Sequence, residues 1–244
     1  YYLICAEGGT GFNHSEVVFR SKSVEGPFLS YEKNPILTQR HLDPKRNNPV
    51  TTTGHADLVE GPHGKWWAVF LGCRPYEGDY YNTGRETFMA PVEWKDGWPQ
   101  FNLGGDEVKY SYPINAVVDN NREPFNGNYH FRDDFEKEIL NARYRFLRTK
   151  RSQWYNLNEN PGSLSLRLQP ETCSGKANPS FIGFQQPHLE GYAATAIRFN
   201  AKAENEKAGL LIFQNESHFY FLCKSVKEGT PMLELYKAKE LLAS

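Results

Sequence analysis

The chain has 244 residues, a net charge of -1, 23% charged residues and 39% hydrophobic residues. This composition is typical of a globular protein. The near-zero net charge argues against nucleic acid as a partner. No run approaches the roughly 18 apolar residues that a membrane span requires, so no membrane partner is expected.

Aromatic residues make up 14% of the chain, with 14 Tyr, 16 Phe and 5 Trp. Aromatic side chains favour β-strands, and they also line carbohydrate sites, where the C–H face of a sugar packs on a ring. We take core packing as the first interpretation. The four cysteines show no CxxC or CxxH spacing, so no zinc site is predicted.

Residues 1–125 consist of short aromatic and β-branched runs, such as YYLICA, SEVVFRS, HADLVE and WWAVFLGC, separated by turn signals. The segment GPHGKW between two such runs predicts a hairpin. Repeated hairpins of this size favour a propeller or barrel over an α/β fold. Residues 112–130 contain two Pro and five Asn, which indicates a domain boundary near residue 125.

Residues 126–244 predict a β-sandwich, because SLSLRLQ, TAIRF and FYFLCK alternate apolar and polar residues with a period of two. The run FEKEILNARYRFL is compatible with a short helix, a strand or a loop. The chain begins inside a strand without Met and ends soon after MLELYKA. We therefore expect that the native N-terminus is missing and that the sandwich is truncated.

Glu7 follows the apolar run YYLICA, which predicts a central strand, and precedes Gly8 and Gly9. A carboxylic acid at the inner end of a buried strand loses hydration, and this favours the protonated form that a general acid needs. The two glycines let the backbone turn and leave room for a ligand. An ordinary glutamate beside a glycine-rich turn is the alternative.

Two later residues occupy similar junctions. His55 follows Gly54 in TTTGHADLVE, and Arg85 follows Gly84 in YYNTGRETFMAPVEW. In a propeller such junctions converge near the central axis. The guanidinium of an arginine is suited to holding hydroxyl groups or a carboxylate.

Taken together, AEGGTGFNHSEVVFRSKSVEGPF, GHADLVEGPHGKWWAVFLGCRP and GRETFMAPVEWKDGWP resemble glycoside hydrolase family 43, the β-xylosidase and α-L-arabinofuranosidase family. They are similar to the third to fifth blades of its propeller, and FRDDF resembles the start of its accessory sandwich. The resemblance implies an all-β fold. Residues 1–125 would be the C-terminal blades of a five-bladed β-propeller, and residues 126–244 part of a concanavalin-like β-sandwich.

The resemblance also implies the site residues. Glu7 matches the general acid of the family, Arg85 matches an arginine that binds the sugar, and His55 matches a histidine on the propeller axis. No cofactor is required, but His55 could hold a structural calcium ion, directly or through water. Asp57 and Glu86 are interpreted as structural, on the expectation that strand alternation points them away from His55 and Arg85.

The implied mechanism is inversion, in which an acid protonates the leaving group and an opposed carboxylate activates water. In the family, the aspartate that serves as base lies in the first blade and the aspartate that modulates the pKa of the acid lies in the second. Both blades precede the strand that carries Glu7. We therefore expect this chain alone to be inactive. The implied substrates are xylan-derived oligosaccharides or arabinofuranosyl side chains, with a slight preference for β-xylosidase activity. Compartment and oligomeric state stay open.

Other readings are weighed against this one. His14 is interpreted as a solvated loop residue rather than a pocket residue, and Trp66 and Trp67 as core. Tyrosines at 76, 80 and 81, just before Arg85, could form a platform for substrate. The alternative functions are a non-catalytic carbohydrate-binding protein and an interaction propeller. The combination of Glu7, His55 and Arg85 favours the enzyme.

Overall fold

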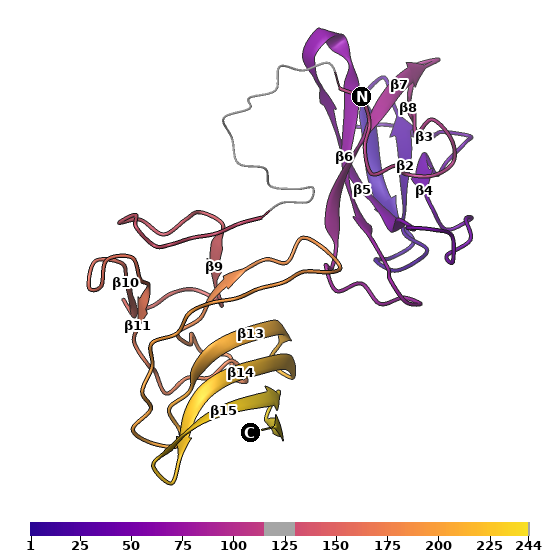
Figure 1. Ribbon diagram of the computed structural model, residues 1–244. Helices are drawn as coiled ribbons and strands as arrows, with labels where there is room; N and C mark the ends of the chain where they lie inside the picture. The colour runs from indigo at the N-terminus through magenta and orange to yellow at the C-terminus, as the bar shows by residue number, and fades with distance from the viewer. Residues whose placement is uncertain (115–129, 244) are drawn as a thin grey trace. The chain divides into compact units, whose positions relative to one another are not determined.

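The computed structural model describes residues 1–114 and 130–243 (Figure 1). The chain divides into two compact units, Tyr1–Glu123 and Pro124–Ser244. The boundary expected near residue 125 lies outside the described residues. Within the described residues no helix has the length and apolar character to cross a membrane.

The first sheet of the first unit is built around β2. Strand β1 pairs with one edge of β2, while the short β3 and β4 pair with its other edge. The bounds are Tyr2–Glu7 for β1, Ser15–Arg20 for β2, Leu29–Ser30 for β3 and Leu37–Thr38 for β4. All pairs are antiparallel, and Glu7 at the end of β1 lies opposite Ser15 at the start of β2.

The second sheet is a four-stranded antiparallel meander in the order β5-β6-β7-β8. These strands are Thr51–Glu60, Trp66–Cys73, Glu86–Lys95 and Trp98–Phe101. The hairpin predicted at GPHGKW joins β5 to β6 through a 3₁₀ turn, η1, at Pro62–Gly64. Strands β7 and β8 meet at Asp96 and Gly97, both of which have positive φ, as a tight D-G hairpin turn requires.

A four-stranded antiparallel meander is the usual form of a propeller blade. The described residues of the first unit form two four-stranded sheets, of which β5-β6-β7-β8 is such a meander, while the first has β3 and β4 both paired with β2; the resemblance implied three blades. The fold of this unit is therefore part of a β-propeller, with two blades present in the described residues.

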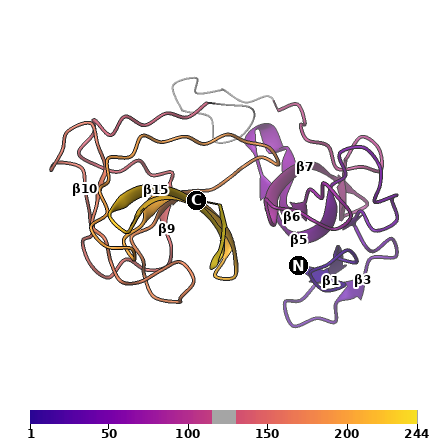
Figure 2. The ribbon, with the colours of Figure 1, turned by 60° about the horizontal axis from the view of Figure 1, so that its bottom comes forward.

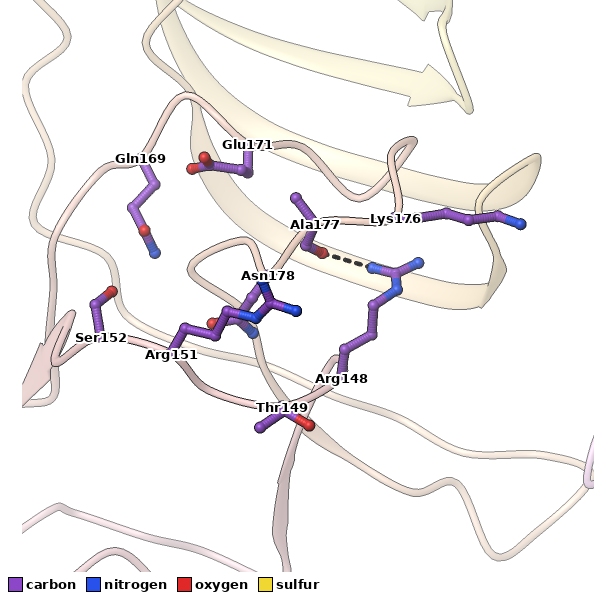
Figure 3. Close-up of a pocket in the computed structure, with 9 residues that line it drawn as sticks. All are labelled: Arg148, Thr149, Arg151, Ser152, Gln169, Glu171, Lys176, Ala177 and Asn178. Atoms are coloured by element: carbon purple, nitrogen blue, oxygen red, sulfur yellow. Dashed lines mark hydrogen bonds between the residues drawn. The ribbon is translucent and has the colours of Figure 1, made fainter.

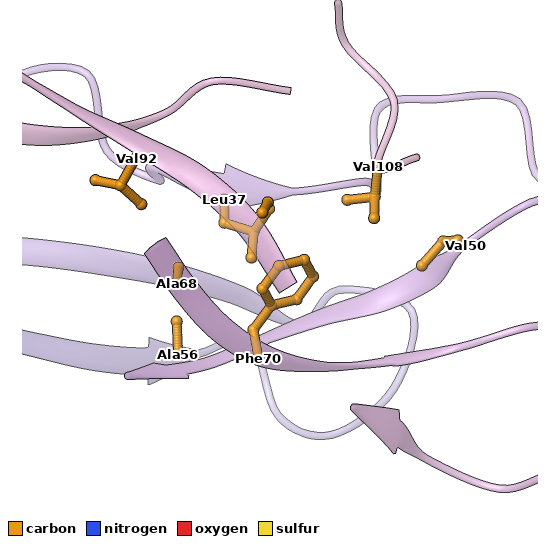
Figure 4. Close-up of a cluster of buried hydrophobic side chains, with 8 residues drawn as sticks. Leu37, Val50, Ala56, Ala68, Phe70, Val92 and Val108 are labelled. Atoms are coloured by element: carbon orange, nitrogen blue, oxygen red, sulfur yellow. The ribbon is translucent and has the colours of Figure 1, made fainter. Parts of the chain in front are cut away.

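The main core of the first unit lies where these two sheets meet. Side chains from β4, β5, β6 and β7 converge there and are joined by residues from the loops (Figure 4). Phe70 stacks on Phe88 with ring centroids 6.1 Å apart. The buried members are Leu37, Val50, Ala56, Ala68, Phe70, Ala90, Val92 and Val108.

Strand β1 is an edge strand, so the expectation that YYLICA is a central strand is wrong. Tyr2 and Leu3 are 43% and 45% exposed, and only Ile4 and Cys5 are half-buried. In the part of the chain that the structure describes, it pairs with β2 alone, because the hydrophobicity of a strand does not determine how many partners it finds. Strand β1 also lies beside β5 (Figure 2).

The second unit contains a four-stranded curved sheet and two small two-stranded sheets (Figures 1 and 2). The curved sheet is β13-β14-β15-β16, at Ala208–Asn215, His218–Lys227, Thr230–Lys237 and Glu240–Ala243. The small sheets pair β9 with β12 and β10 with β11, at Tyr144–Phe146, Ile182–Phe184, Tyr155–Asn156 and Ser165–Leu166.

Three segments of this unit differ from expectation or settle an open choice. TAIRF at 195–199 is not a strand, and SLSLRLQ at 163–169 is a strand only at Ser165–Leu166. Residues 135–147, which were left open, form turns and β9 rather than a helix. Alternating apolar and polar side chains are typical of a strand, but a strand also needs a neighbouring strand to pair with. The alternation in these segments does not determine whether such a neighbour exists.

Candidate active site

Glu7 is the last residue of β1, and its carboxylate is exposed rather than buried as expected. The hydroxyl of Ser15 donates a hydrogen bond of 3.1 Å to Glu7 Oε1. Gly8 has a φ of +75°, and a Cβ at this position would lie 2.1 Å from the carbonyl oxygen of Asn13. Only glycine therefore fits directly after the acid, which confirms the expected glycine turn at this position.

His55 lies in an irregular part of β5. Its φ is +56°, which is uncommon for a residue other than glycine. The pairing of β5 with β6 shifts register between Thr51 and Gly54 and again between Gly54 and Asp57. These are the marks of β-bulges, which re-aim a side chain. The four residues before His55 are buried, whereas the His55 side chain is exposed to solvent.

Gly54 is the point at which β5 approaches the start of β2. A Cβ at Gly54 would lie 2.5 Å from His14 Cδ2 and 3.0 Å from the carbonyl oxygen of Ser15. Both distances are too short for a side chain at position 54. Strand β5 therefore packs directly against Ser15, the residue that hydrogen-bonds Glu7. Glycine at position 54 allows this close approach because it has no side chain.

Three consecutive polar residues connect the two places. His14, Ser15 and Glu16, which we call the polar triplet, are 3%, 0% and 1% exposed. His14 Nδ1–H donates to the carbonyl of Gly9, Ser15 donates to Glu7, and Glu16 Oε2 accepts a 2.9 Å hydrogen bond from the Ala56 amide. His14 is thus fully buried, and the interpretation as a solvated loop residue is wrong, because its ring is covered by Gly54.

Burial raises the pKa of Glu16 above its usual value. Hydrogen bonds from the amides of Ala56 and His55 act in the opposite direction, and so does the imidazole of His55, while the carboxylate of Asp57 adds to the increase. Desolvation is the largest of these effects. The buried carboxylate is therefore costly to ionise. The interactions that favour its ionised form, from the amides of Ala56 and His55 and the imidazole of His55, come from β5.

Arg85 directly precedes β7, and its side chain is exposed. The next residue, Glu86, is held in a bidentate ion pair: Arg74 Nε and Nη2 donate to its two oxygens at 2.7 and 2.6 Å. Thr83 Oγ1 donates to the same carboxylate at 2.9 Å. This pair anchors the start of β7 and agrees with a structural role for Glu86.

The strand register places Arg85 at the same end of the sheet as His55. Gly54 lies opposite Leu71, and Leu71 lies opposite Thr87, two residues after Arg85. Within the described residues, however, no hydrogen bond joins the side chains of Glu7, His55 and Arg85 to one another. The structure thus places Glu7 and His55 on neighbouring strands and Arg85 at the same end of the second sheet as His55.

The three tyrosines named on the loop before Arg85 are all exposed, Tyr81 at 41%. Tyr76 is 55% exposed and Tyr80 is 70% exposed, with ring centroids 6.4 Å apart. The amide of Tyr76 donates to the carbonyl of Tyr80 at 3.0 Å, which holds the two residues side by side. This geometry supports the interpretation as a platform. Trp67, by contrast, is 6% exposed and belongs to the core.

Asp57 does not point away from His55 as expected. Both residues are exposed, and the buried Ala56 lies between them, so residues two positions apart share a side here. Even so, no group of three or more potential metal-ligating side chains occurs in the part of the chain that the structure describes. Calcium requires six to eight oxygen ligands. The described residues do not by themselves supply such a set at His55, and the calcium ion expected there stays a prediction.

The polar triplet was missed from sequence, although it has a signal. The letters HSE stand directly before VVF, within a segment read as a strand. Polar residues at the buried start of a strand need hydrogen-bond partners. These polar residues indicate that the start of the strand contacts another segment. They do not indicate which segment it contacts.

The second unit has a cavity of about 400 Å³ with a polar rim (Figure 3). Arg148 donates to the carbonyl of Ala177 at 2.8 Å and forms an ion pair with Glu216. None of its described lining residues is aromatic, so these residues offer no ring on which a sugar could stack. The lining residues are Arg148, Thr149, Arg151, Ser152, Gln169, Glu171, Lys176, Ala177 and Asn178.

Comparison with known families assigns both units. Residues 1–99 match the glycosyl hydrolases family 43 model. Residues 132–243 match the model of the β-xylosidase C-terminal concanavalin A-like domain. The two matches follow the same order as the two compact units.

Individual relatives agree with these matches. The chain is 38% identical over 231 residues to a non-reducing end α-L-arabinofuranosidase of Bacteroides ovatus, covering 94% of this chain and 42% of that protein. It is 37% identical over 235 residues to a xylosidase/arabinosidase of Butyrivibrio fibrisolvens, covering 93% and 43%. Among solved structures, a Bacteroides ovatus xyloglucan-locus protein of family 43 superimposes with a TM-score of 0.81 at 35% identity, covering 100% of this chain and 47% of that one.

The chain spans less than half the length of these relatives. Over that span both the propeller sheets and the concanavalin-like unit are matched. The chain belongs to glycoside hydrolase family 43.

Proposed function

We propose that this chain takes part in the hydrolysis of glycosidic bonds with inversion, and that Glu7 is the general acid. Family membership and the glycosidase names of the relatives support this class of reaction. The observation that carries the assignment to Glu7 is its position. The carboxylate stands exposed at an open sheet edge, is oriented by Ser15, and lies on the strand beside the His55 strand.

Glu7 would donate its proton to the oxygen of the departing sugar. The hydroxyl of Ser15 hydrogen-bonds one carboxylate oxygen and leaves the other free for this task. The exposed edge of β1 leaves space in front of Glu7 for a sugar and for further propeller sheets. Those sheets would exclude water from the acid and thereby favour its protonated form.

Inversion also needs a carboxylate about 6.5–9.5 Å from the acid, on the far side of the sugar, to activate water. We assign this base, and the aspartate that modulates the pKa of the acid, to residues that are not among the 244 of this sequence. The chain by itself is then expected to hydrolyse nothing. The complete enzyme, meaning this chain together with the residues that supply the base, is expected to be active.

Arg85 and His55 would bind the sugar beside the acid. The guanidinium of Arg85 can donate two parallel hydrogen bonds to neighbouring hydroxyl groups. Fixing the sugar in this way lowers the barrier by holding the reacting bond in line with the acid. The exposed rings of Tyr76 and Tyr80 offer a stacking surface at the rim. We derive no step through a calcium ion.

The proposed substrates are xylan-derived oligosaccharides or arabinofuranosyl side chains, cleaved from the non-reducing end. The relatives that carry the names arabinofuranosidase and xylosidase/arabinosidase match the chain at nearly equal identity. We therefore propose that the complete enzyme accepts both sugars.

The test is Glu7→Gln in the complete enzyme, measured on two glycosides. An alkyl or sugar leaving group needs a proton, so turnover is expected to fall about 100- to 10,000-fold. A dinitrophenyl leaving group needs almost no protonation, so its loss is expected to be much smaller. Equal losses on both glycosides, or no loss, would rule out Glu7 as the acid.

A further inference from the structure

Glu16 is a buried carboxylate for which the proposed mechanism has no direct use. It is 1% exposed, and Oε2 accepts a 2.9 Å hydrogen bond from the amide of Ala56. The neighbouring amide of His55 also hydrogen-bonds this carboxylate. The hydrogen bonds that hold it thus come from two successive amides of β5, one of which belongs to the residue proposed to bind sugar.

The backbone that Glu16 holds is strained. His55 has a φ of +56°, and β5 shifts register on both sides of it. A residue other than glycine is strained in this conformation, which persists only where its surroundings impose it. Here the surroundings are Glu16, which holds the amides, and the ring of His14, which packs on Gly54.

Folding stability alone does not explain an ionisable group at this position. Burial makes the charged form of Glu16 costly, and its hydrogen bonds offset this only in part. Neutral residues of similar size usually stabilise such a site as well or better. Charge does, however, strengthen hydrogen bonds from backbone amides and so restricts their direction.

We propose that Glu16 is a positioning residue, which fixes the turn at His55 and thereby aims the imidazole of His55 into the sugar site. This inference rests on the proposed function, because it takes the sugar-binding role of His55 from there. Glu16 itself touches no substrate.

The first measurement concerns the turn and does not need activity. Glu16→Gln keeps one acceptor oxygen without charge, and Glu16→Leu removes both oxygens. Amide hydrogen exchange at His55 and Ala56, followed by NMR in the 244-residue chain, is expected to accelerate about tenfold in Glu16→Leu and less in Glu16→Gln. Unchanged exchange in both variants would overturn the inference.

The control is Glu234→Gln, which alters a comparably buried carboxylate of the second unit, 7% exposed. It is expected to leave exchange at His55 and Ala56 unchanged. Glu16→Gln is also expected to unfold at the same denaturant concentration as the parent chain or at a higher one, because it removes a desolvated charge. A purely structural role predicts the opposite, namely a loss of stability that accompanies every loss of activity.

The second measurement is a double-mutant cycle in the complete enzyme. Glu16→Leu is expected to lower kcat/KM about 10- to 100-fold, as the loss of an orienting partner usually does. In a His55→Ala background the same change should cost less than about twofold, since its effect passes through His55. Losses that multiply would overturn the inference.

The cycle also separates this inference from the proposed function. If His55→Ala leaves kcat/KM unchanged, the sugar-binding role of His55 is wrong and the functional half of the inference is overturned with it. The amide exchange then still decides whether Glu16 holds the turn. If Glu7→Gln is harmless while the cycle is coupled, the acid assignment fails and the positioning role of Glu16 stands.

Discussion

Among the described residues, each unit of the protein buries one glutamate, and the two glutamates are held in opposite ways. Glu16 in the first unit accepts hydrogen bonds from backbone amides, and burial raises its pKa. Glu234 in the second unit accepts a 2.5 Å bond from the ammonium group of Lys207 and a 3.0 Å bond from the Tyr236 hydroxyl. The hydrogen bond from Lys207 is the main cause that lowers the pKa of Glu234. Burial alone therefore does not fix the charge state; the partners do.

The difference indicates different roles. The ion pair of Glu234 with Lys207 connects β15 to the start of β13 and satisfies both charges. Glu16 leaves its charge without such compensation but controls the direction of two amides in a strained turn. We interpret the first as a stabilising contact and the second as a contact retained for geometry.

The largest effect on stability is expected when the pair in the second unit is broken. Glu234→Leu leaves the partly buried ammonium group of Lys207 without its partner, and it should lower the free energy of unfolding by about 3 kcal/mol. Glu16→Gln leaves no charge unpaired and should cause no loss. Urea unfolding of both variants measures this. If Glu16→Gln proved the more damaging change, the contrast between the two glutamates would be wrong.

A second test concerns the close packing that surrounds Glu16. In Gly54→Ala the new methyl group would lie 2.5 Å from the ring of His14 and 3.0 Å from the Ser15 carbonyl. Such overpacking should cost about 2 kcal/mol and displace His55. Gly11→Ala is the control, because a Cβ there meets no atom within 4 Å and φ is not positive. Equal midpoints in urea for the two variants would show that β5 does not press on the polar triplet.

The smallest effect is a difference in acid response. The stabilising contribution of Glu234 is complete above the ordinary glutamate value of 4.5 and is lost as the pH falls through its lowered pKa. Glu16 behaves in reverse: its burial penalty is complete above its raised pKa and is relieved as the pH falls towards 4.5. His55 and Asp57 face Glu16 and modify this window.

Hydrogen exchange measured by mass spectrometry between neutral pH and pH 4 follows each unit separately. After correction for intrinsic exchange rates, strands β13–β15 should lose protection before β2 and β5. Glu234→Gln should abolish this order by removing the acid-sensitive pair. Earlier loss in β2 and β5 would contradict the assignment of the two pKa directions.

Local turn chemistry made much of the fold predictable. The hairpin at 61–65 forms as expected, and glycine and turn residues specify it, like the turn at Asp96–Gly97, within a few positions. The edge position of β1 was not predictable, since it depends on partners far away in the sequence. The alternating segment TAIRF likewise carries the side-chain pattern of a strand but pairs with no strand among the described residues.

The candidate site shows the same division. Glu7, His55 and Arg85 could be named from their motifs, and their roles stay predictions. The buried state of His14 and the contacts of Glu16 follow from the approach of β5 to the start of β2, which only the folded chain specifies. Sequence patterns therefore indicate which groups do chemistry more readily than which groups hold them in place.

The most direct test of the central claim is a crystal structure of the complete enzyme with a non-hydrolysable thioglycoside of xylose or arabinofuranose. We expect the Glu7 carboxylate within hydrogen-bonding distance of the bridging sulfur. His55 and Arg85 should contact the same sugar ring, with the amides of His55 and Ala56 still bound to Glu16. A ligand bound elsewhere, with Glu7 facing only solvent, would contradict the assignment of this chain to the acid side of a glycosidase site.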